Sequence, residues 1–125
     1  MEKKAIIVGA GLVGSLWAVY MAKAGYKVTI YERRPDIRKA EISAGKSINL
    51  ALSNRGWKAL KNAGVDHLVN EIAIPMTGRI MHSTEGDLTY QAYGKEDEAI
   101  YSVSRGHLNA IMMDIAENKG GANIF

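Results

Sequence analysis

Three glycines near the start of the chain have the spacing of a turn that binds a dinucleotide. Gly9, Gly11 and Gly14 lie in the stretch VGAGLVGSLWA, residues 8–18. In such a turn the first glycine permits a tight bend, the second lets the backbone approach a pyrophosphate, and the third lets a helix pack closely on a strand. The N-terminus of the following helix would offer free N–H groups and a partial positive charge to the phosphates.

An acidic residue follows this turn at the distance that a ribose-binding carboxylate requires. Glu32 lies 18 residues after Gly14, at the end of the second expected strand. Its carboxylate would accept hydrogen bonds from the adenosine ribose and repel a 2′-phosphate, which argues against NADP in this site. Arg33 and Arg34 would attract such a phosphate and leave that point open. The motif does not separate FAD from NAD, and the glycines could also merely join a strand to a helix.

The residues around the motif predict the strand–helix–strand unit that would position it. Residues 5–8 are a short apolar run, typical of a central parallel strand. Residues 12–24 carry an apolar stripe at helical spacing, and Gly25 is suited to the C-terminal cap. Residues 27–31 alternate and are rich in β-formers, so they predict the second strand.

The remainder of the chain predicts further strands and helices. We expect a loop with a helical turn at 33–45, an extended segment at 47–52, a helix from the cap residue Ser53 to about Ala63, a short helix at 66–71, strands at 77–83, 88–93 and 99–103, a helix after Ser104 whose apolar side is Leu108, Ile111, Met112 and Ile115, and the start of a strand at 122–125.

Composition limits the classes of partner. The 125 residues are 47% hydrophobic with a net charge of +3, which is typical of a single folded domain, or part of one, and too weakly basic to indicate nucleic-acid binding. The chain has no cysteine, which excludes a disulfide or a thiolate metal site within it. Residues 5–22 carry no charge and could be read as a signal peptide or membrane helix. The three glycines favour a strand, turn and helix instead, so we expect no membrane segment here.

Three later segments are more specific than the glycine motif: GKSINLALSNRGWKAL, IPMTGRIMHS and IYSVSRGHLN. In order and spacing they resemble the kynurenine 3-monooxygenase family, flavin-dependent aromatic hydroxylases of the para-hydroxybenzoate hydroxylase type. The resemblance covers nearly the whole chain. It implies an α/β fold: a Rossmann-like βαβ FAD-binding domain of the GR2 type, joined to part of a β-sheet region on the substrate side that includes a hairpin near 77–93.

The resemblance also implies an activity and a set of binding residues. Enzymes of this family bind FAD, consume NADPH and molecular oxygen, and hydroxylate L-kynurenine to 3-hydroxykynurenine in tryptophan degradation. The flavin supplies the chemistry, while the protein positions the ring and excludes water. The implied FAD contacts beyond the glycines are Val13, Tyr31, Glu32, Arg33, Arg34, Ala51 and Arg105, and the implied substrate contacts are Arg79 and Tyr93. No residue receives a catalytic or metal-binding role. The three histidines are poor catalytic candidates by their positions, and no two of them have metal-site spacing.

Two arginines also stand out by their own positions. Arg105 is expected in the first turn of a helix, where a cation is unfavourable by up to about 1 kcal/mol unless an anion compensates. A flavin pyrophosphate would compensate, although an exposed arginine or a surface ion pair is the alternative. Arg79 lies on a strand beside Ile80 and Met81, which predicts partial burial and a carboxylate partner. That partner would be the substrate or a protein acid such as Glu85 or Asp87, and the hairpin would bring Arg79 close to Ala92 and Tyr93.

We expect residues 1–125 to be the N-terminal part of such an enzyme. The family's Asp-Gly and Gly-Asp motifs, which complete the flavin site, would lie beyond residue 125. The segment alone would then be inactive and could self-associate through an open sheet edge. The lysine-rich sequence favours a cytoplasmic protein. Two alternatives remain at this point. Preference for NAD over FAD would favour an NAD-dependent dehydrogenase, and nucleotide binding without a substrate effect would favour a stand-alone nucleotide-binding module.

Overall fold

A computed structural model describes residues 1–39, 48–96 and 98–125. The elements run in the order β1 (Lys3–Val8), α1 (Leu12–Lys23), β2 (Tyr26–Tyr31), β3 (Asn49–Leu52), α2 (Asn54–Ala63), α3 (Asp66–Asn70), β4 (Ile74–Met76), β5 (Gly78–His82), β6 (Leu88–Ala92), β7 (Ile100–Ser104), α4 (Arg105–Asn118) and β8 (Asn123–Ile124). Every predicted strand and helix is therefore confirmed, with ends shifted by at most two residues. The last part of the loop predicted at 33–45 lies outside the described residues.

A parallel sheet carries the glycine turn. Its strand order is β1-β2-β8, and β1 and β2 pair in parallel from Lys3 with Tyr26 to Val8 with Tyr31. The strand predicted at the end of the chain is present as β8, which pairs with β2. β1 and β8 are the edge strands of this described sheet. This strand–helix–strand arrangement places the residues after β1 and β2 at one end of the sheet.

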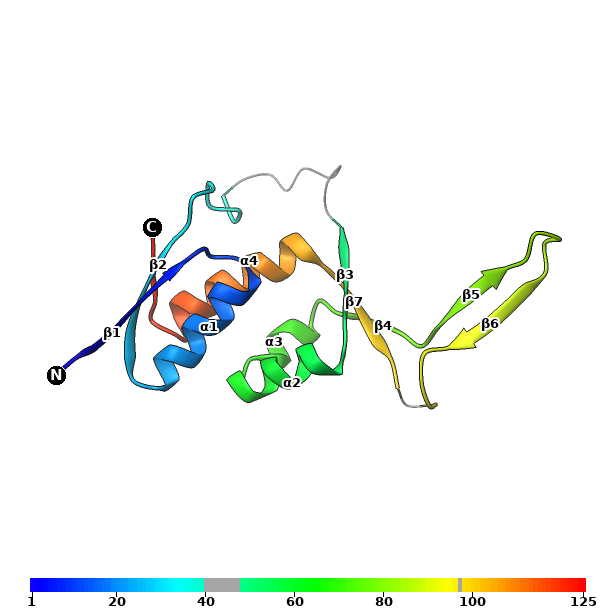
Figure 1. The fold of residues 1–125 in the computed structure, drawn as a ribbon, viewed down its shortest axis with the longest axis horizontal. Helices are drawn as coiled ribbons and strands as arrows, with labels where there is room; N and C mark the ends of the chain where they lie inside the picture. Colours follow the sequence, from blue (N-terminus) through cyan, green and yellow to red (C-terminus); the bar gives the residue numbers. More distant parts are fainter. Residues whose placement is uncertain (40–47, 97) are drawn as a thin grey trace.

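Helices α1 and α4 pack against each other and against the sheet, and both begin on the side that faces β3 and β7 (Figure 1). Both contribute to two apolar clusters, one against the sheet and one shared with α2, α3 and β7. In α4 the predicted apolar side is confirmed, since Leu108, Met112 and Ile115 are buried and Ile111 packs against them. Because strand and turn occupy the start of the uncharged run at 5–22, that run is not one continuous helix. No helix in the described ranges is long and apolar enough to cross a membrane.

A second, antiparallel sheet has the order β3-β7-β4. Helix α2 follows β3 and ends as predicted at Gly64, whose φ of 77° is left-handed and suits glycine. Strand β4 was not predicted, because Pro75 at its centre cannot donate a ladder hydrogen bond. Pro75 is accommodated because β4 is an edge strand of this described sheet, so that one of its two sides pairs with β7 and the other has no neighbouring strand in the sheet.

Strands β5 and β6 form a hairpin that projects away from the rest of the chain (Figure 1). Its turn contains Gly86 with a φ of 94°, which an L side chain rarely adopts. Gly78 is required for a different reason: a Cβ there would lie 2.5 Å from the backbone carbonyl oxygen of Gln91 and 2.5 Å from the ring and hydroxyl of Tyr90. The Tyr90 hydroxyl also bonds to Thr77 Oγ1 at 3.0 Å, so this ring closes the base of the hairpin.

Candidate dinucleotide-binding site

The three glycines occupy the turn for three different geometric reasons, as their spacing predicts. Gly9 has a φ of 103° and makes the bend after β1. A Cβ on Gly14 would lie only 2.0 Å from the carbonyl oxygen of Gly9, so α1 packs on the turn at a distance that excludes any side chain. A Cβ on Gly11 would meet nothing within 4 Å. Since neither strain nor contact requires glycine at position 11, the open space there is available to a ligand's pyrophosphate.

The N-terminus of α1 is free to bind an anion. Gly11 is its N-cap, no side chain caps it, and its first turn contains no acidic residue. The side chain of Val13, in this first turn, is 83% exposed. The unpaired N–H groups and the positive end of the helix dipole therefore face solvent where phosphates would bind.

Glu32 is held at the end of β2 with its carboxylate directed to the glycine turn. Its Oε2 accepts a hydrogen bond from the backbone N–H of Ala10 at 2.8 Å, and its Oε1 accepts from the backbone N–H of Arg34 at 2.9 Å. The side chain is only 11% exposed. Hydrogen bonds from the side chain and backbone of Arg34, then from Ala10, lower the pKa of Glu32 from 4.5 to about 2. The carboxylate is therefore charged at neutral pH and keeps lone pairs for ribose hydroxyls.

The two arginines after Glu32 differ in their contacts. Arg34 turns back, and its Nε donates to Glu32 Oε1 at 3.2 Å, so its charge is largely matched by that carboxylate. Arg33 is exposed. Tyr31, before them, stacks on Phe125 with ring centroids 5.9 Å apart. The sequence left open whether these arginines attract a 2′-phosphate, and the Arg34–Glu32 pair reduces that attraction.

The other two residues that the resemblance assigns to FAD lie outside this turn. Ala51 is exposed on β3 and pairs with Ser102 of β7. Arg105 begins α4 and is exposed, and no described carboxylate forms an ion pair with it. The first turn of α4 contains no acidic residue to offset this cation. Arg105 is thus an exposed charge without an ion-pair partner among the described residues, at the start of α4, on the side where α1 also begins (Figure 1).

The expectation that Arg79 is partly buried is wrong. Arg79 lies exposed on β5, and its neighbour Ile80 is 62% exposed, because no described element packs over the hairpin. Its guanidinium bonds to Gln91 rather than to Glu85 or Asp87. The hairpin pairs Arg79 with Gln91, next to Ala92, so the predicted proximity to Ala92 is confirmed. Tyr93 lies one residue further along and pairs with Thr77 through its backbone N–H.

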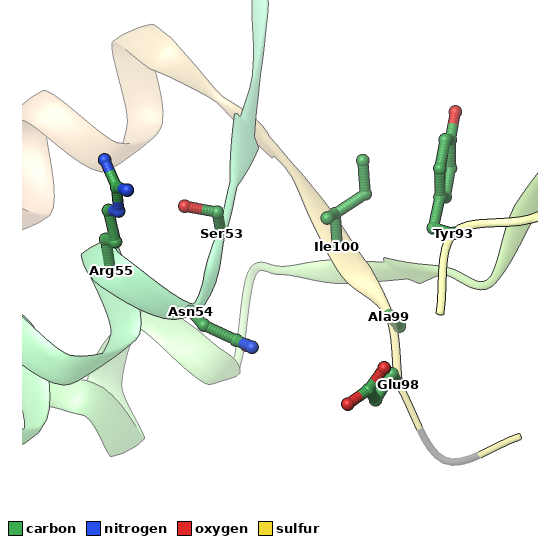
Figure 2. A pocket seen from close by; sticks show the side chains of 7 residues that line it. All are labelled: Ser53, Asn54, Arg55, Tyr93, Glu98, Ala99 and Ile100. Carbon is green, nitrogen blue, oxygen red and sulfur yellow. The ribbon is translucent and has the colours of Figure 1, made fainter. Parts of the chain in front are cut away.

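Tyr93 borders a cavity of about 270 Å³ at the base of the hairpin. Figure 2 shows its lining side chains, from the start of α2, the approach to β7 and the end of β6: Ser53, Asn54, Arg55, Tyr93, Glu98, Ala99 and Ile100. The Glu98 carboxylate accepts a hydrogen bond from the backbone N–H of Lys95 at 2.9 Å. Arg79 is not among these lining residues, so the described structure does not place both predicted substrate contacts in one cavity.

Sequence reasoning missed an arginine cluster that holds the segment after β2. Arg38 bonds to Asp36 at 2.8 Å and also pairs with Asp114 and Glu117 of α4. The side chain of Arg38 is only 20% exposed. Hydrogen bonds from Arg38 lower the pKa of Asp36 to about 2, and these carboxylates raise the pKa of Arg38. The Asp-x-Arg spacing signalled a local pair, but the partners on α4 are 76 and 79 residues away in sequence.

The described residues contain no group of three histidine, cysteine or acidic side chains that could hold a metal ion. The fold and the glycine turn together define a different class of site: a Rossmann unit that binds FAD or NAD(P). The family model that matches the chain agrees with this class. The chain belongs to the pyridine nucleotide-disulphide oxidoreductase family, whose model matches residues 4–73.

Over nearly its whole length the chain is also similar to the N-terminal region of kynurenine 3-monooxygenases. It is 57% identical to the protein of that name from Flavobacterium johnsoniae, over 98% of this chain and 27% of the relative. It is 54% identical to the one from Christiangramia forsetii, over 95% of this chain and 26% of the relative. The chain thus spans about a quarter of the length of the curated relatives it matches.

Solved structures show the same fold at low sequence identity. The p-nitrophenol 4-monooxygenase PnpA from Pseudomonas putida DLL-E4 matches with a TM-score of 0.75 and 18% identity, over 100% of this chain and 31% of that one. A tetrameric 2-methyl-3-hydroxypyridine-5-carboxylic acid oxygenase matches with a TM-score of 0.75 and 17% identity, over 99% and 31%. The predicted α/β Rossmann-like fold is therefore confirmed, and it is the fold of part of these oxygenases.

Proposed function

We propose that these 125 residues are the N-terminal part of an enzyme that hydroxylates L-kynurenine to 3-hydroxykynurenine, with FAD bound and with NADPH and molecular oxygen as co-substrates. The observation that carries the proposal is the 54–57% identity to kynurenine 3-monooxygenases over 95–98% of this chain. The chain covers only about a quarter of those relatives, so the activity is proposed for a longer protein. The 125 residues alone are expected to be inactive.

The residues present fit the adenosine and pyrophosphate part of FAD. Open space at Gly11 and an uncapped α1 suit the pyrophosphate, and the charged Glu32 suits the ribose hydroxyls. The proposed FAD contacts also include residues of two helix starts, Val13 in the first turn of α1 and Arg105 in the first turn of α4. The remaining ones are the segment Tyr31 to Arg34 and Ala51. When bound, FAD supplies the oxygen chemistry, and this chain holds and orients it.

NADPH is proposed to act without occupying this turn. A 2′-phosphate at the ribose would lie against a carboxylate that stays charged well below neutral pH, which is unfavourable. The guanidinium of Arg34 is already paired with this Glu32 carboxylate. The turn therefore favours a ribose without a 2′-phosphate, as in FAD.

On the substrate side we propose Arg79 and Tyr93 as contacts of L-kynurenine. Arg79 makes no ion pair with a described carboxylate, so its charge is available to the substrate carboxylate. A planar guanidinium can bind a carboxylate through two parallel hydrogen bonds. The exposed Tyr93 offers a phenol on the same hairpin.

The experiment that tests this proposal compares the full-length protein that carries these residues with residues 1–125 alone. We expect the full-length protein to purify with FAD and to form 3-hydroxykynurenine from L-kynurenine only when NADPH and oxygen are present. We expect the 125-residue chain to form no product. A flavin-loaded full-length protein that consumes no kynurenine would refute the proposed substrate, and product from the short chain would refute its inactivity.

A binding measurement on the short chain tests the cofactor separately. Calorimetric titration should give tighter binding of FAD than of NAD, and Glu32→Ala should weaken it. The matched control is Glu2→Ala, an exposed acid at the opposite end of β1, which should leave FAD binding unchanged. Tighter binding of NAD would instead favour a dehydrogenase.

A further inference from the structure

The β5–β6 hairpin has one apolar face and one polar face. Its register pairs Ile80 with Tyr90 and His82 with Leu88, so these side chains lie on one face. It pairs Arg79 with Gln91 and Met81 with Thr89, and these four lie on the other face, which is polar except for Met81. The backbone N–H of Tyr93 donates to Thr77 O at 2.9 Å, which extends the ladder beyond β6. Alternation along the strand then places Tyr93 on the same face as Gln91.

On this polar face Gln91 holds the guanidinium of Arg79. Arg79 Nε donates to Gln91 Oε1 at 2.8 Å, across the strand pair. Since a guanidinium only donates, the amide oxygen and not the amide nitrogen must face it. This bond uses the Nε edge of Arg79 and leaves its two terminal nitrogens without partners among the described residues. Those nitrogens are available to grip a carboxylate.

We propose that Gln91 is a positioning residue for the α-carboxylate of the amino-acid substrate, an inference that rests on the proposed function. It acts through Arg79, by fixing the plane of a long side chain that would otherwise sample many rotamers. A neutral amide suits this role better than a carboxylate. It anchors the guanidinium without neutralising the charge that the substrate needs, whereas an acid at this position would compete with the substrate.

Kinetics of the full-length, flavin-loaded protein test this role. Gln91→Leu removes the acceptor but keeps a side chain of similar size on an exposed strand. We expect the KM for L-kynurenine to rise roughly tenfold with kcat nearly unchanged. The KM for kynuramine, the analogue without the α-carboxylate, should stay the same. Thr89→Leu is the matched control, because Thr89 lies on the same face of the same strand, opposite Met81, and it should change neither KM.

Coupling to Arg79 separates positioning from a general effect on the hairpin. In an Arg79→Lys background Gln91→Leu should add less than a twofold change, since a lysine has no Nε edge to hold. An unchanged KM in Gln91→Leu, an equal rise for kynurenine and kynuramine, or full additivity with Arg79→Lys would each overturn the inference. Absence of kynurenine turnover in the unmodified protein would instead refute the proposed function.

Discussion

Substitution of Gly14 by alanine tests whether close packing of α1 on the turn is what the glycine provides. A Cβ at position 14 would lie 2.0 Å from Gly9 O, and a real Cβ is essentially never nearer than 3.0 Å to such an atom. The start of α1 must therefore move by about 1 Å. Overpacking of this kind costs about 1–3 kcal/mol. The upper end of this range applies because the obstacle is a backbone atom. The better helix propensity of alanine offsets about 1 kcal/mol of this cost.

We therefore expect Gly14→Ala to lower the free energy of unfolding by about 2 kcal/mol, which for a chain of this size is a fall in Tm of roughly 8 °C. Urea denaturation followed by circular dichroism measures the change. Gly11→Ala is the matched control, because position 11 has a φ of −75° and open space around it. It should change unfolding by less than about 0.5 kcal/mol. Its Cβ would still occupy the pyrophosphate space, so FAD affinity should fall at least tenfold.

Two results would refute this reasoning. If Gly14→Ala unfolds like the unmodified chain, the contact with Gly9 O does not control the packing of α1. If Gly11→Ala leaves FAD affinity unchanged, the open space beside Gly11 is not where the pyrophosphate binds. The two substitutions thus separate the glycine that the fold requires from the glycine that the ligand requires.

Three further expectations concern charges and buried polar groups. Because the pKa of Glu32 is lowered from 4.5 to about 2, its charged form contributes stability above about pH 4.5, and this contribution is lost as the pH falls toward 2. Glu32→Gln should therefore flatten the dependence of the free energy of unfolding on pH between pH 5 and 2, measured by urea denaturation at each pH. Arg38→Leu should lower the free energy of unfolding by about 1–2 kcal/mol, because it leaves three carboxylates without their partner, whereas Lys39→Leu, on an exposed neighbour, should leave denaturation unchanged. Asn109 is buried with an unbonded Oδ1, so Asn109→Leu should leave stability equal or raise it by up to about 1 kcal/mol, and a loss above 1 kcal/mol would show that the amide has a partner.

Local signals were sufficient for the Rossmann unit because its determinants are close in sequence. Gly9, Gly11 and Gly14 define the turn, and alternation in β2 ends at Glu32, so the cradle can be predicted without any distant contact. The Arg38 cluster could not be predicted in this way. Its two partners on α4 are 76 and 79 residues away, and they meet Arg38 only because α4 packs beside α1 on the same sheet.

The hairpin shows how a small uncertainty in register changes a site. A turn near Gly86 predicts that Arg79 lies close to Ala92 but does not give the register, and the ladder, which closes with His82 opposite Leu88, gives Arg79 the partner Gln91. A shift of one residue moves every side chain of a strand to the other face. The length and composition of the turn do not determine this register. It also depends on a hydrogen bond within the turn, which the backbone N–H of Asp87 donates to Ser83 Oγ. The sequence alone therefore does not identify Gln91 as the residue that orients Arg79. That assignment requires the pairing of the two strands, because it depends on which residue of β6 lies opposite Arg79.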